Sequence, residues 1–314
     1  MRHVAVPSPA DLDAAAELVA ARLAPTPLVP APALGEDVWL KLETLQPTGS
    51  FKVRGGLAAL ARLGGEPVVT ASAGNAGLGV AWAAAALGVE ATIVVAETAS
   101  PAKVAALAAL PVTVVQHGDG YDAAEAHALS LSGATYVSSY NDTGLIAGQA
   151  TIGRELDVQL PGPLTVLAPM GGGGLASGLG LWAAHRPGGA ARVVAIEAER
   201  STAMSAALAA GEITPVPIGD TIADGLAGNI EAGSVTFPIV RDHVAAVVQA
   251  SEAEIEEGIR FLARAHGIVA EGAGAAGVAA ALAGRIPRGD GALVIVVTGR
   301  NIALPRLAAV LGAA

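Results

Sequence analysis

The chain has 314 residues, of which 53% are hydrophobic and 3% aromatic, and its formal net charge at pH 7 is −10. This length and hydrophobic content suit one large domain or two lobes with a sizeable core. The acidic balance, without a run of basic residues, argues against a nucleic-acid-binding protein. The absence of cysteine excludes disulfides, thiolate metal ligands and a cysteine nucleophile. Acidic residues interrupt the first helical stretch, and the longest uncharged apolar runs are too short to span a bilayer, so we expect a soluble, cytoplasmic protein.

The first elements are predicted from local signals. Ser8 followed by Pro9 predicts an N-cap and a helix that runs to about Leu23. Four prolines then predict an extended segment, and 38–42 a short strand. Beyond this point short apolar strands alternate with helices. The other expected strands are 68–70, 91–95, 112–115, 135–137, 164–168, 193–197, 244–249 and 292–297. The other expected helices are 75–87, 101–110, 121–131, 143–156, one that starts in the glycine run at 171, 251–266 and 302–311.

This alternation predicts an α/β fold with parallel sheets that carry helices on both faces. We expect two lobes, each a three-layer α/β/α arrangement around a mostly parallel, twisted sheet. Residues 1–66 and 145–314 are expected to form a large, ligand-binding domain, and residues 67–144 a small domain. Because ligands of parallel sheets bind beyond the carboxyl ends of strands, the loops after the strands are the candidate site.

Lys52 lies in a glycine-rich, turn-prone and apolar stretch, just before an amphipathic run. Burial penalises the charged form of a lysine and so lowers its pKa. A neutral amine can attack an aldehyde and form an imine. Taken alone, the stretch leaves open the alternative that Lys52 merely opens a surface helix.

Two strand ends carry anion-binding signals. Ser72, Ala73, Gly74 and Asn75 follow one strand and open a helix, whose free amides attract a carboxylate, although a simple capping turn fits too. A run of four glycines follows another strand, and without Cβ atoms its backbone can wrap a phosphate. The run lacks the Walker A and dinucleotide-binding spacings, which favours a single phosphate over a pyrophosphate. These glycines are Gly171, Gly172, Gly173 and Gly174.

Thr298 follows the last buried strand and presents a hydroxyl at the strand end, or caps the final helix. Together the candidates describe one ligand. It has a carbonyl for Lys52, a phosphate for the four glycines, a polar ring substituent for Asn75 and a ring nitrogen for Thr298. Pyridoxal 5'-phosphate carries all four groups.

From about residue 26 to residue 301 the chain closely resembles the fold type II, tryptophan synthase β-like pyridoxal-phosphate enzymes, within the threonine/serine dehydratase and serine racemase group. Several spaced motifs in the right order make the resemblance specific. They are Thr48-Gly49-Ser50-Phe51-Lys52-Val53-Arg54-Gly55, Ser72-Ala73-Gly74-Asn75, Ala147-Gly148-Gln149, the four glycines at 171–174, Thr221-Ile222-Ala223-Asp224-Gly225-Leu226-Ala227 and Glu271-Gly272-Ala273-Gly274-Ala275.

The resemblance implies roles for the cofactor-binding residues. Lys52 would join the cofactor aldehyde and move the substrate α-proton, with Phe51 packed beside the cofactor. The glycines at 171–174 would hold the phosphate. Asn75 would meet the ring 3'-oxygen, and Thr298 the pyridine nitrogen.

The implied substrate contacts are Ser72, Ala73 and Gly74 with the α-carboxylate. A neutral hydroxyl at the pyridine nitrogen favours β-elimination, because it leaves the carbanion short-lived, so a β-hydroxy amino acid such as L-threonine or L-serine would give a 2-oxo acid and ammonia. Racemases of the family place a serine at the position of Ala73, which cannot carry a proton. Racemase, threonine synthase-like and hydroxyaspartate- or hydroxyectoine-pathway dehydratase activities stay open, as does a non-enzymatic phosphate- or nucleotide-binding α/β protein.

Arg300 stands where most members of the family have a small residue. It could reach an additional substrate carboxylate or be a solvated surface side chain. Some relatives bind a divalent cation near Glu197, but the second acidic ligand is Ala203 here, and we expect no metal. The resemblance implies a homodimer. Since the last motif lies close to Ala314, we expect no C-terminal regulatory domain.

Overall fold

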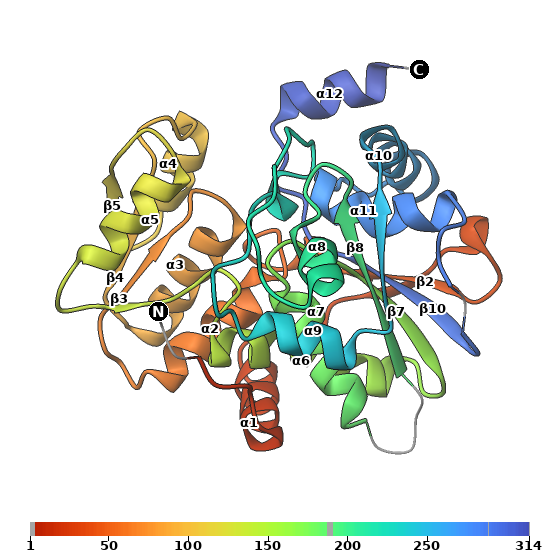
Figure 1. The fold of residues 1–314 in the computed structure, drawn as a ribbon, viewed down its shortest axis with the longest axis horizontal. Coiled ribbons are helices and arrows are strands. Elements are labelled where there is room, and N and C mark those ends of the chain that lie inside the picture. The colour runs from red at the N-terminus through yellow and green to blue at the C-terminus, as the bar shows by residue number, and fades with distance from the viewer. Residues whose placement is uncertain (1–3, 187–190, 288, 314) are drawn as a thin grey trace.

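The structure is a computed structural model that describes residues 4–186, 191–287 and 289–313. Within these ranges the strands form two sheets, one of six strands and one of four. Figure 1 shows the four-stranded sheet with its helices on the left and the six-stranded sheet on the right.

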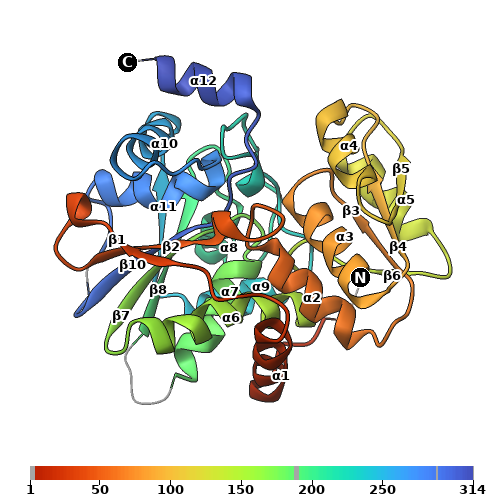
Figure 2. The same cartoon turned by 180° about the vertical axis from the view of Figure 1, so that it is seen from behind.

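The six-stranded sheet has the order β1-β2-β10-β7-β8-β9. Every neighbouring pair is parallel except the edge pair of β1 with β2, which lies at the outer side of the molecule in Figure 2. The central strands β7 and β10 are buried almost throughout, as expected when helices cover both faces of a parallel sheet. The strands are β1 (Leu28–Pro30), β2 (Val38–Leu42), β7 (Leu164–Pro169), β8 (Ala191–Ala198), β9 (Ala246–Ala250) and β10 (Ala292–Val297).

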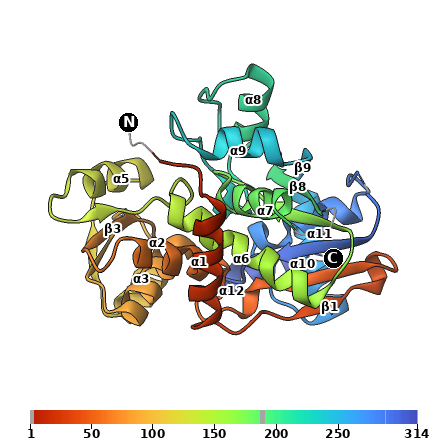
Figure 3. The same ribbon diagram turned by 90° about the horizontal axis from the view of Figure 1, so that it is seen from below.

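Two separate cores lie on the two faces of this sheet. In β10, Val294 and Val296 pack into one core and Ile295 and Val297 into the other, because successive side chains of a strand point to opposite faces. The first face is covered by α6, α7 and α9, with α1 and α8 beside them, and Figure 3 shows α7, α8 and α9 together. The second face is covered by α10 and α11. These helices are α1 (Pro9–Ala20), α6 (Thr143–Gln159), α7 (Gly174–Ala184), α8 (Ala203–Ala210), α9 (Thr236–His243), α10 (Glu252–His266) and α11 (Gly272–Leu282).

The four-stranded sheet has the order β5-β4-β3-β6, and all its pairs are parallel. Helices α2, α3 and α4 contribute to the core on one face, and α5 covers the other. The strands are β3 (Val68–Ala71), β4 (Ala91–Val95), β5 (Thr113–Gln116) and β6 (Thr135–Tyr136). The helices are α2 (Lys52–Arg62), α3 (Asn75–Leu87), α4 (Pro101–Ala108) and α5 (Tyr121–Ser130).

Two mostly parallel sheets flanked by helices confirm the expected α/β fold class. The exact division into 1–66 with 145–314 and 67–144 stays a prediction. The predicted N-cap of α1 is present, and both α1 and α10 begin with a capping box. Helices α8, α9 and α11 were not predicted. The remaining elements are α12 (Leu304–Gly312) and the short 3₁₀ helices η1 (Pro32–Leu34), η2 (Glu43–Leu45) and η3 (Asp224–Leu226).

Candidate active site

The loop that leads into Lys52 is paired with the segment that follows β10. The backbone N–H of Phe51 donates to the carbonyl oxygen of Thr298 at 3.0 Å. The backbone N–H of Arg300 donates to the carbonyl oxygen of Gly49 at 2.9 Å. Because these bonds run between main-chain atoms, they hold the first residue of α2, Lys52, at the carboxyl end of β10.

The side chain of Lys52 is partly buried, and its Nζ donates to the carbonyl oxygen of Ser139 at 2.7 Å. The same nitrogen lies 5.2 Å from the centroid of the Phe51 ring. Burial lowers the pKa of Lys52 to about 8, although the charge of Glu271 opposes the shift. Among the described residues no acidic side chain forms a salt bridge with Lys52. A substantial fraction of this amine is therefore neutral near pH 8, as a nucleophile or a base requires.

Close packing of α2 and α3 brings the 72–75 loop to Lys52. A Cβ atom on Gly56 would lie 2.6 Å from the carbonyl oxygen of Gly79. A Cβ atom on Gly79 would lie 2.7 Å from the carbonyl oxygen of Lys52. Only glycines permit this approach, which places the first turn of α3 against the first turn of α2.

The 72–75 loop connects the end of β3 with the start of α3 at Asn75. Its residues are partly exposed, and the backbone N–H of Gly74 donates to Ser72 Oγ at 3.2 Å. The free amides at the start of this 13-residue helix form an environment that suits an anion.

The four glycines form a tightly packed turn between β7 and α7. A Cβ atom on Gly172 would lie 2.4 Å from the ring of Tyr140. One on Gly171 would lie 3.0 Å from the backbone of Leu226. Gly173 has φ of +89°, a left-handed conformation that favours glycine. The turn therefore leads into an 11-residue helix whose N-cap has no side-chain cap, an arrangement that fits a phosphate group.

Two further predicted residues lie at the same edge. Thr298 directly follows β10 and is only 2% exposed. The side-chain amide of Asn75 donates from Nδ2 to Oε1 of Glu271 at 2.7 Å, and its Oδ1 accepts from Nδ2 of Asn301 at 2.6 Å. The structure thus gathers the loops after β3, β7 and β10 and the start of α2.

The sequence motifs assigned no individual role to three residues of this region. Glu271 is buried next to Asn75, and burial together with the charge of Asp224 raises its pKa to about 7. Ser139 and Tyr140 contact Lys52 and the glycine turn, respectively. These two follow β6, so the rule that ligands bind after parallel strands could have found them.

Arg300 faces the main chain in this structure. Its Nη1 donates to the carbonyl oxygen of Thr44 at 2.5 Å, so the guanidinium holds the loop before Lys52.

The carboxylate of Glu197 is buried and accepts hydrogen bonds from the backbone N–H of Met204 at 2.8 Å and of Ser205 at 3.2 Å. It therefore caps the first turn of α8, whose N-cap residue makes no side-chain cap of its own. Within the described ranges no group of three or more acidic or histidine side chains is arranged to hold a metal ion.

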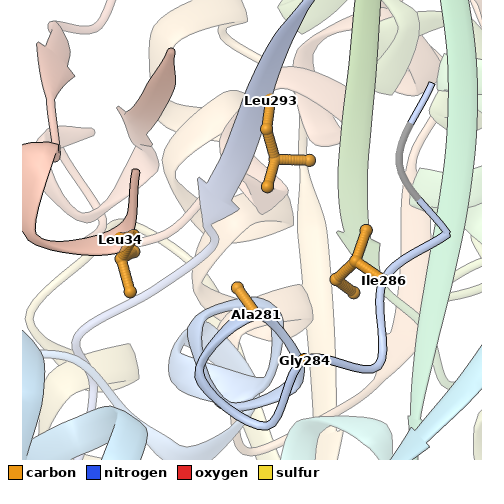
Figure 4. Close-up of a pocket in the computed structure, with 5 residues that line it drawn as sticks. All are labelled: Leu34, Ala281, Gly284, Ile286 and Leu293. Atoms are coloured by element: carbon orange, nitrogen blue, oxygen red, sulfur yellow. The ribbon is translucent and has the colours of Figure 1, made fainter. Parts of the chain in front are cut away.

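A pocket of about 280 Å³ lies elsewhere, as Figure 4 shows. It is lined by Leu34, Ala281, Gly284, Ile286 and Leu293. Leu293 is near the start of β10, whereas Thr298 follows its end, so this pocket lies at the opposite end of the strand from Lys52.

The residues that are brought together fit pyridoxal phosphate. A lysine amine of lowered pKa suits the aldehyde, and the glycine turn, which a Cβ would fill, suits the phosphate. The family model of pyridoxal-phosphate-dependent enzymes matches residues 19–299. The chain belongs to this family.

Within the family, the chain stands in the threonine/serine dehydratase and serine racemase group. It is 40% identical over 275 residues to the L-threonine ammonia-lyase of Thermotoga maritima, an alignment that covers 85% of this chain and 68% of that protein. It is 35% identical over 285 residues to the catabolic L-threonine dehydratase of Escherichia coli, covering 88% and 86% of the two chains.

Solved structures agree with this assignment. Maize serine racemase aligns with a TM-score of 0.89 and 28% identity over 96% of both chains. The processed form of threonine deaminase isoform 2 from Solanum lycopersicum aligns with a TM-score of 0.87 and 29% identity, over 99% of this chain and 95% of that one. In the described part of the chain, no helix has the length and apolar character needed to cross a membrane.

Proposed function

We propose that this protein dehydrates and deaminates a β-hydroxy amino acid, L-threonine or L-serine, to a 2-oxo acid and ammonia. The observation that carries the proposal is the Lys52 amine, with its pKa lowered to about 8, held between an anion-binding loop at 72–75 and the glycine turn. The relatives named as threonine ammonia-lyase and threonine dehydratase support the same substrate class.

The cofactor would be held by the residues that meet at this edge. The backbone amides of the glycines at 171–174 would bind its phosphate, and the start of α7 adds a favourable dipole. Asn75 would donate to its ring 3'-oxygen, Thr298 would face its pyridine nitrogen, and Phe51 would pack beside the ring. When bound, pyridoxal phosphate supplies an aldehyde for amino groups and an electron-withdrawing ring that acidifies the α-proton of a bound amino acid.

The protein's own groups would then act on the substrate. The 72–74 backbone, with the hydroxyl of Ser72, would bind the α-carboxylate and orient the Cα–H bond toward Lys52. The neutral amine of Lys52 would take the proton from Cα, and the β-hydroxyl would leave with one proton, as water, so that the proton count is unchanged and a Cα–Cβ double bond forms. Transfer of the amino proton to Cβ and addition of water at Cα would then release ammonia. In the overall reaction one water molecule is lost and one is added. Threonine is therefore converted to 2-oxobutanoate and ammonia, with no net oxidation.

Ala73 favours elimination over racemisation. Inversion at Cα requires a second proton carrier on the face opposite Lys52. Ala73 occupies the position where racemases of the family place a serine, and its methyl group cannot carry a proton. Without a second proton carrier, the carbanion would react by β-elimination rather than by inversion.

A substrate panel tests the proposal. Purified protein with pyridoxal phosphate is mixed with L-threonine, L-serine, D-serine and 3-hydroxyaspartate, and both 2-oxo acid and enantiomer composition are measured. Formation of 2-oxo acid from L-threonine or L-serine supports the proposal. Inversion of configuration without 2-oxo acid would show a racemase instead, and a protein that binds no pyridoxal phosphate would contradict both.

We also propose that the protein works in the cytoplasm as a homodimer, with 67–144 as a small domain. Analytical ultracentrifugation of the loaded protein measures the oligomeric state directly, and a monomer at micromolar concentration would contradict the dimer.

A further inference from the structure

The amide of Asn75 is held in a chain of hydrogen bonds whose orientation is set at one end by a backbone carbonyl, which can only accept. At one end, the carbonyl oxygen of Thr48 accepts from Nδ2 of Asn301 at 2.8 Å. A backbone carbonyl can only accept, so the nitrogen of the Asn301 amide must face it. The same Nδ2 donates to Oδ1 of Asn75 at 2.6 Å, so the oxygen of Asn75 must face Asn301.

At the other end, Oε1 of Glu271 accepts from Nδ2 of Asn75 at 2.7 Å. Glu271 is 6% exposed and also receives a hydrogen bond from the backbone N–H of Asn301. The hydrogen bond to Glu271 is therefore made in the same orientation of the Asn75 amide that Asn301 sets. One N–H of Asn75 is used by Glu271, and within the described ranges no second acceptor contacts that nitrogen.

The segments that carry this chain come from different parts of the fold. Thr48 is in the loop before Lys52, Asn75 begins α3, Glu271 precedes α11 and Asn301 follows β10. Gly49 has φ of +74°, and a Cβ atom there would lie 2.6 Å from Oδ1 of Asn301. The turn at Gly49 thus fits tightly against the Asn301 amide.

We propose that Asn301 and Glu271 are positioning residues that fix Asn75 as a hydrogen-bond donor toward the ring oxygen of the bound cofactor. The inference rests on the proposed function, in which Asn75 faces that oxygen. A reversed amide would present Oδ1 to an oxygen that is itself an acceptor, so two lone pairs would face each other. Asn301 prevents this reversal by occupying Oδ1 with a donor.

The test compares Asn301→Asp with Asn229→Asp. Aspartate keeps the size of asparagine but has no N–H, so Asn301→Asp leaves both Thr48 and Asn75 facing an acceptor. Asn229 is an exposed residue outside the site whose Nδ2 donates to the carbonyl oxygen of Val216 at 3.0 Å, which makes it a matched control. Asn301→Asp is expected to raise the dissociation constant for pyridoxal phosphate about tenfold, the effect of one lost hydrogen bond. It should also shift the visible absorption band of the loaded protein, whereas Asn229→Asp should change neither.

A double-mutant cycle separates positioning from general damage. If Asn301 acts through Asn75, Asn301→Asp has no further effect on the dissociation constant once Asn75 is Ala. Glu271→Gln, which keeps an acceptor oxygen, should retain the wild-type absorption band, and Glu271→Leu should not. Asn301→Ala serves where the aspartate variant does not fold, and thermal unfolding of the dialysed proteins shows which variants are folded.

The outcomes distinguish the two claims. A wild-type protein that binds no pyridoxal phosphate overturns the proposed function. A normal wild type, together with Asn301 variants whose affinity and spectrum equal those of Asn229→Asp, overturns the positioning role alone. Additive effects of the Asn75 and Asn301 substitutions on affinity also overturn it.

Discussion

Arg54, two residues after Lys52, donates two hydrogen bonds of 2.8 Å to the carboxylate of Glu43, and both side chains are fully buried. Arg54 also donates to Oε1 of Glu155 at 2.6 Å, and Glu155 forms a salt bridge with buried Lys41. Two cations thus face two carboxylates beneath the first turn of α2. Although burial raises the pKa of Glu43, the Arg54 guanidinium holds it below its ordinary value, so the carboxylate stays ionised.

The buried pair should be sensitive to removal of one partner. Arg54→Met leaves buried Glu43 without its ion-pair partner and is expected to lower the free energy of unfolding by about 3–5 kcal/mol. Arg241→Met removes an exposed, solvent-screened pair with Asp242 and should leave the unfolding midpoint close to that of the wild type. Urea unfolding of the loaded protein measures both values. Equal unfolding midpoints for the two variants would contradict the structural role of Arg54.

The lowered pKa of Lys52 predicts a pH dependence. Below pH 8 the amine is mostly protonated and cannot attack an aldehyde, whereas above pH 8 it is mostly neutral. The rate at which the dialysed protein takes up pyridoxal phosphate should therefore rise with pH and level off above a midpoint of about 8. A lysine model compound with its ordinary pKa of about 10.4 is the reference. A midpoint equal to that of the model compound would show that Lys52 is not shifted.

The glycine turn predicts a steric effect on cofactor binding. In Gly172→Ala the new Cβ would lie 2.4 Å from the Tyr140 ring, so ring or turn must move. We expect a loss of about 1–3 kcal/mol, divided between folding and pyridoxal phosphate binding. In Gly120→Ala the new Cβ would meet no atom within 4 Å, and the variant should resemble the wild type. Isothermal titration with pyridoxal phosphate measures binding, and thermal unfolding measures stability. If Gly172→Ala binds pyridoxal phosphate as tightly and unfolds at the same temperature as Gly120→Ala, the glycine turn does not have the proposed steric role.

Local sequence patterns predicted many elements of this fold, several of them with the bounds that the structure shows. The strands β2, β4 and β10 have the predicted bounds because buried apolar runs end at turn residues. Helix α11 was missed because Gly272–Leu282 contains only Gly, Ala, Val and Leu, so it has no polar face that would give a helical period. Its burial between the sheet and its neighbours, rather than amphipathicity, stabilises it.

For the candidate site, too, one part was predicted from the sequence and another part was not. Lys52, the 72–75 loop, the glycine turn and Thr298 each follow or begin an element, so the sequence predicts them as single positions. The contacts between these residues and distant parts of the chain were not predicted. Asn75 meets Glu271 across 196 positions of the chain and Asn301 across 226, and no local pattern encodes such contacts.

Arg300 provides the last prediction, because its contact differs from a substrate-binding one. Its Nη1 donates to the carbonyl oxygen of Thr44, so Arg300→Ala should loosen the loop before Lys52 and lower the free energy of unfolding by about 1.5–3 kcal/mol, the range for a hydrogen bond to a charged group. The ratio of kcat/KM for L-threonine to kcat/KM for 3-hydroxyaspartate should change by no more than about twofold, because a contact with the main chain affects both substrates alike. A tenfold change would correspond to about 1.4 kcal/mol of discrimination between the two substrates.

The matched control for this substitution is Arg200→Ala. Arg200 donates from Nη1 to the carbonyl oxygen of Asp220 at 3.0 Å, in an exposed loop away from Lys52. Arg200→Ala should leave the dissociation constant for pyridoxal phosphate unchanged. Arg300→Ala should raise this constant because Gly49 and Phe51 lie in the loosened loop. A selective loss of activity on 3-hydroxyaspartate in Arg300→Ala, with unchanged stability, would instead identify the guanidinium as the partner of a second substrate carboxylate.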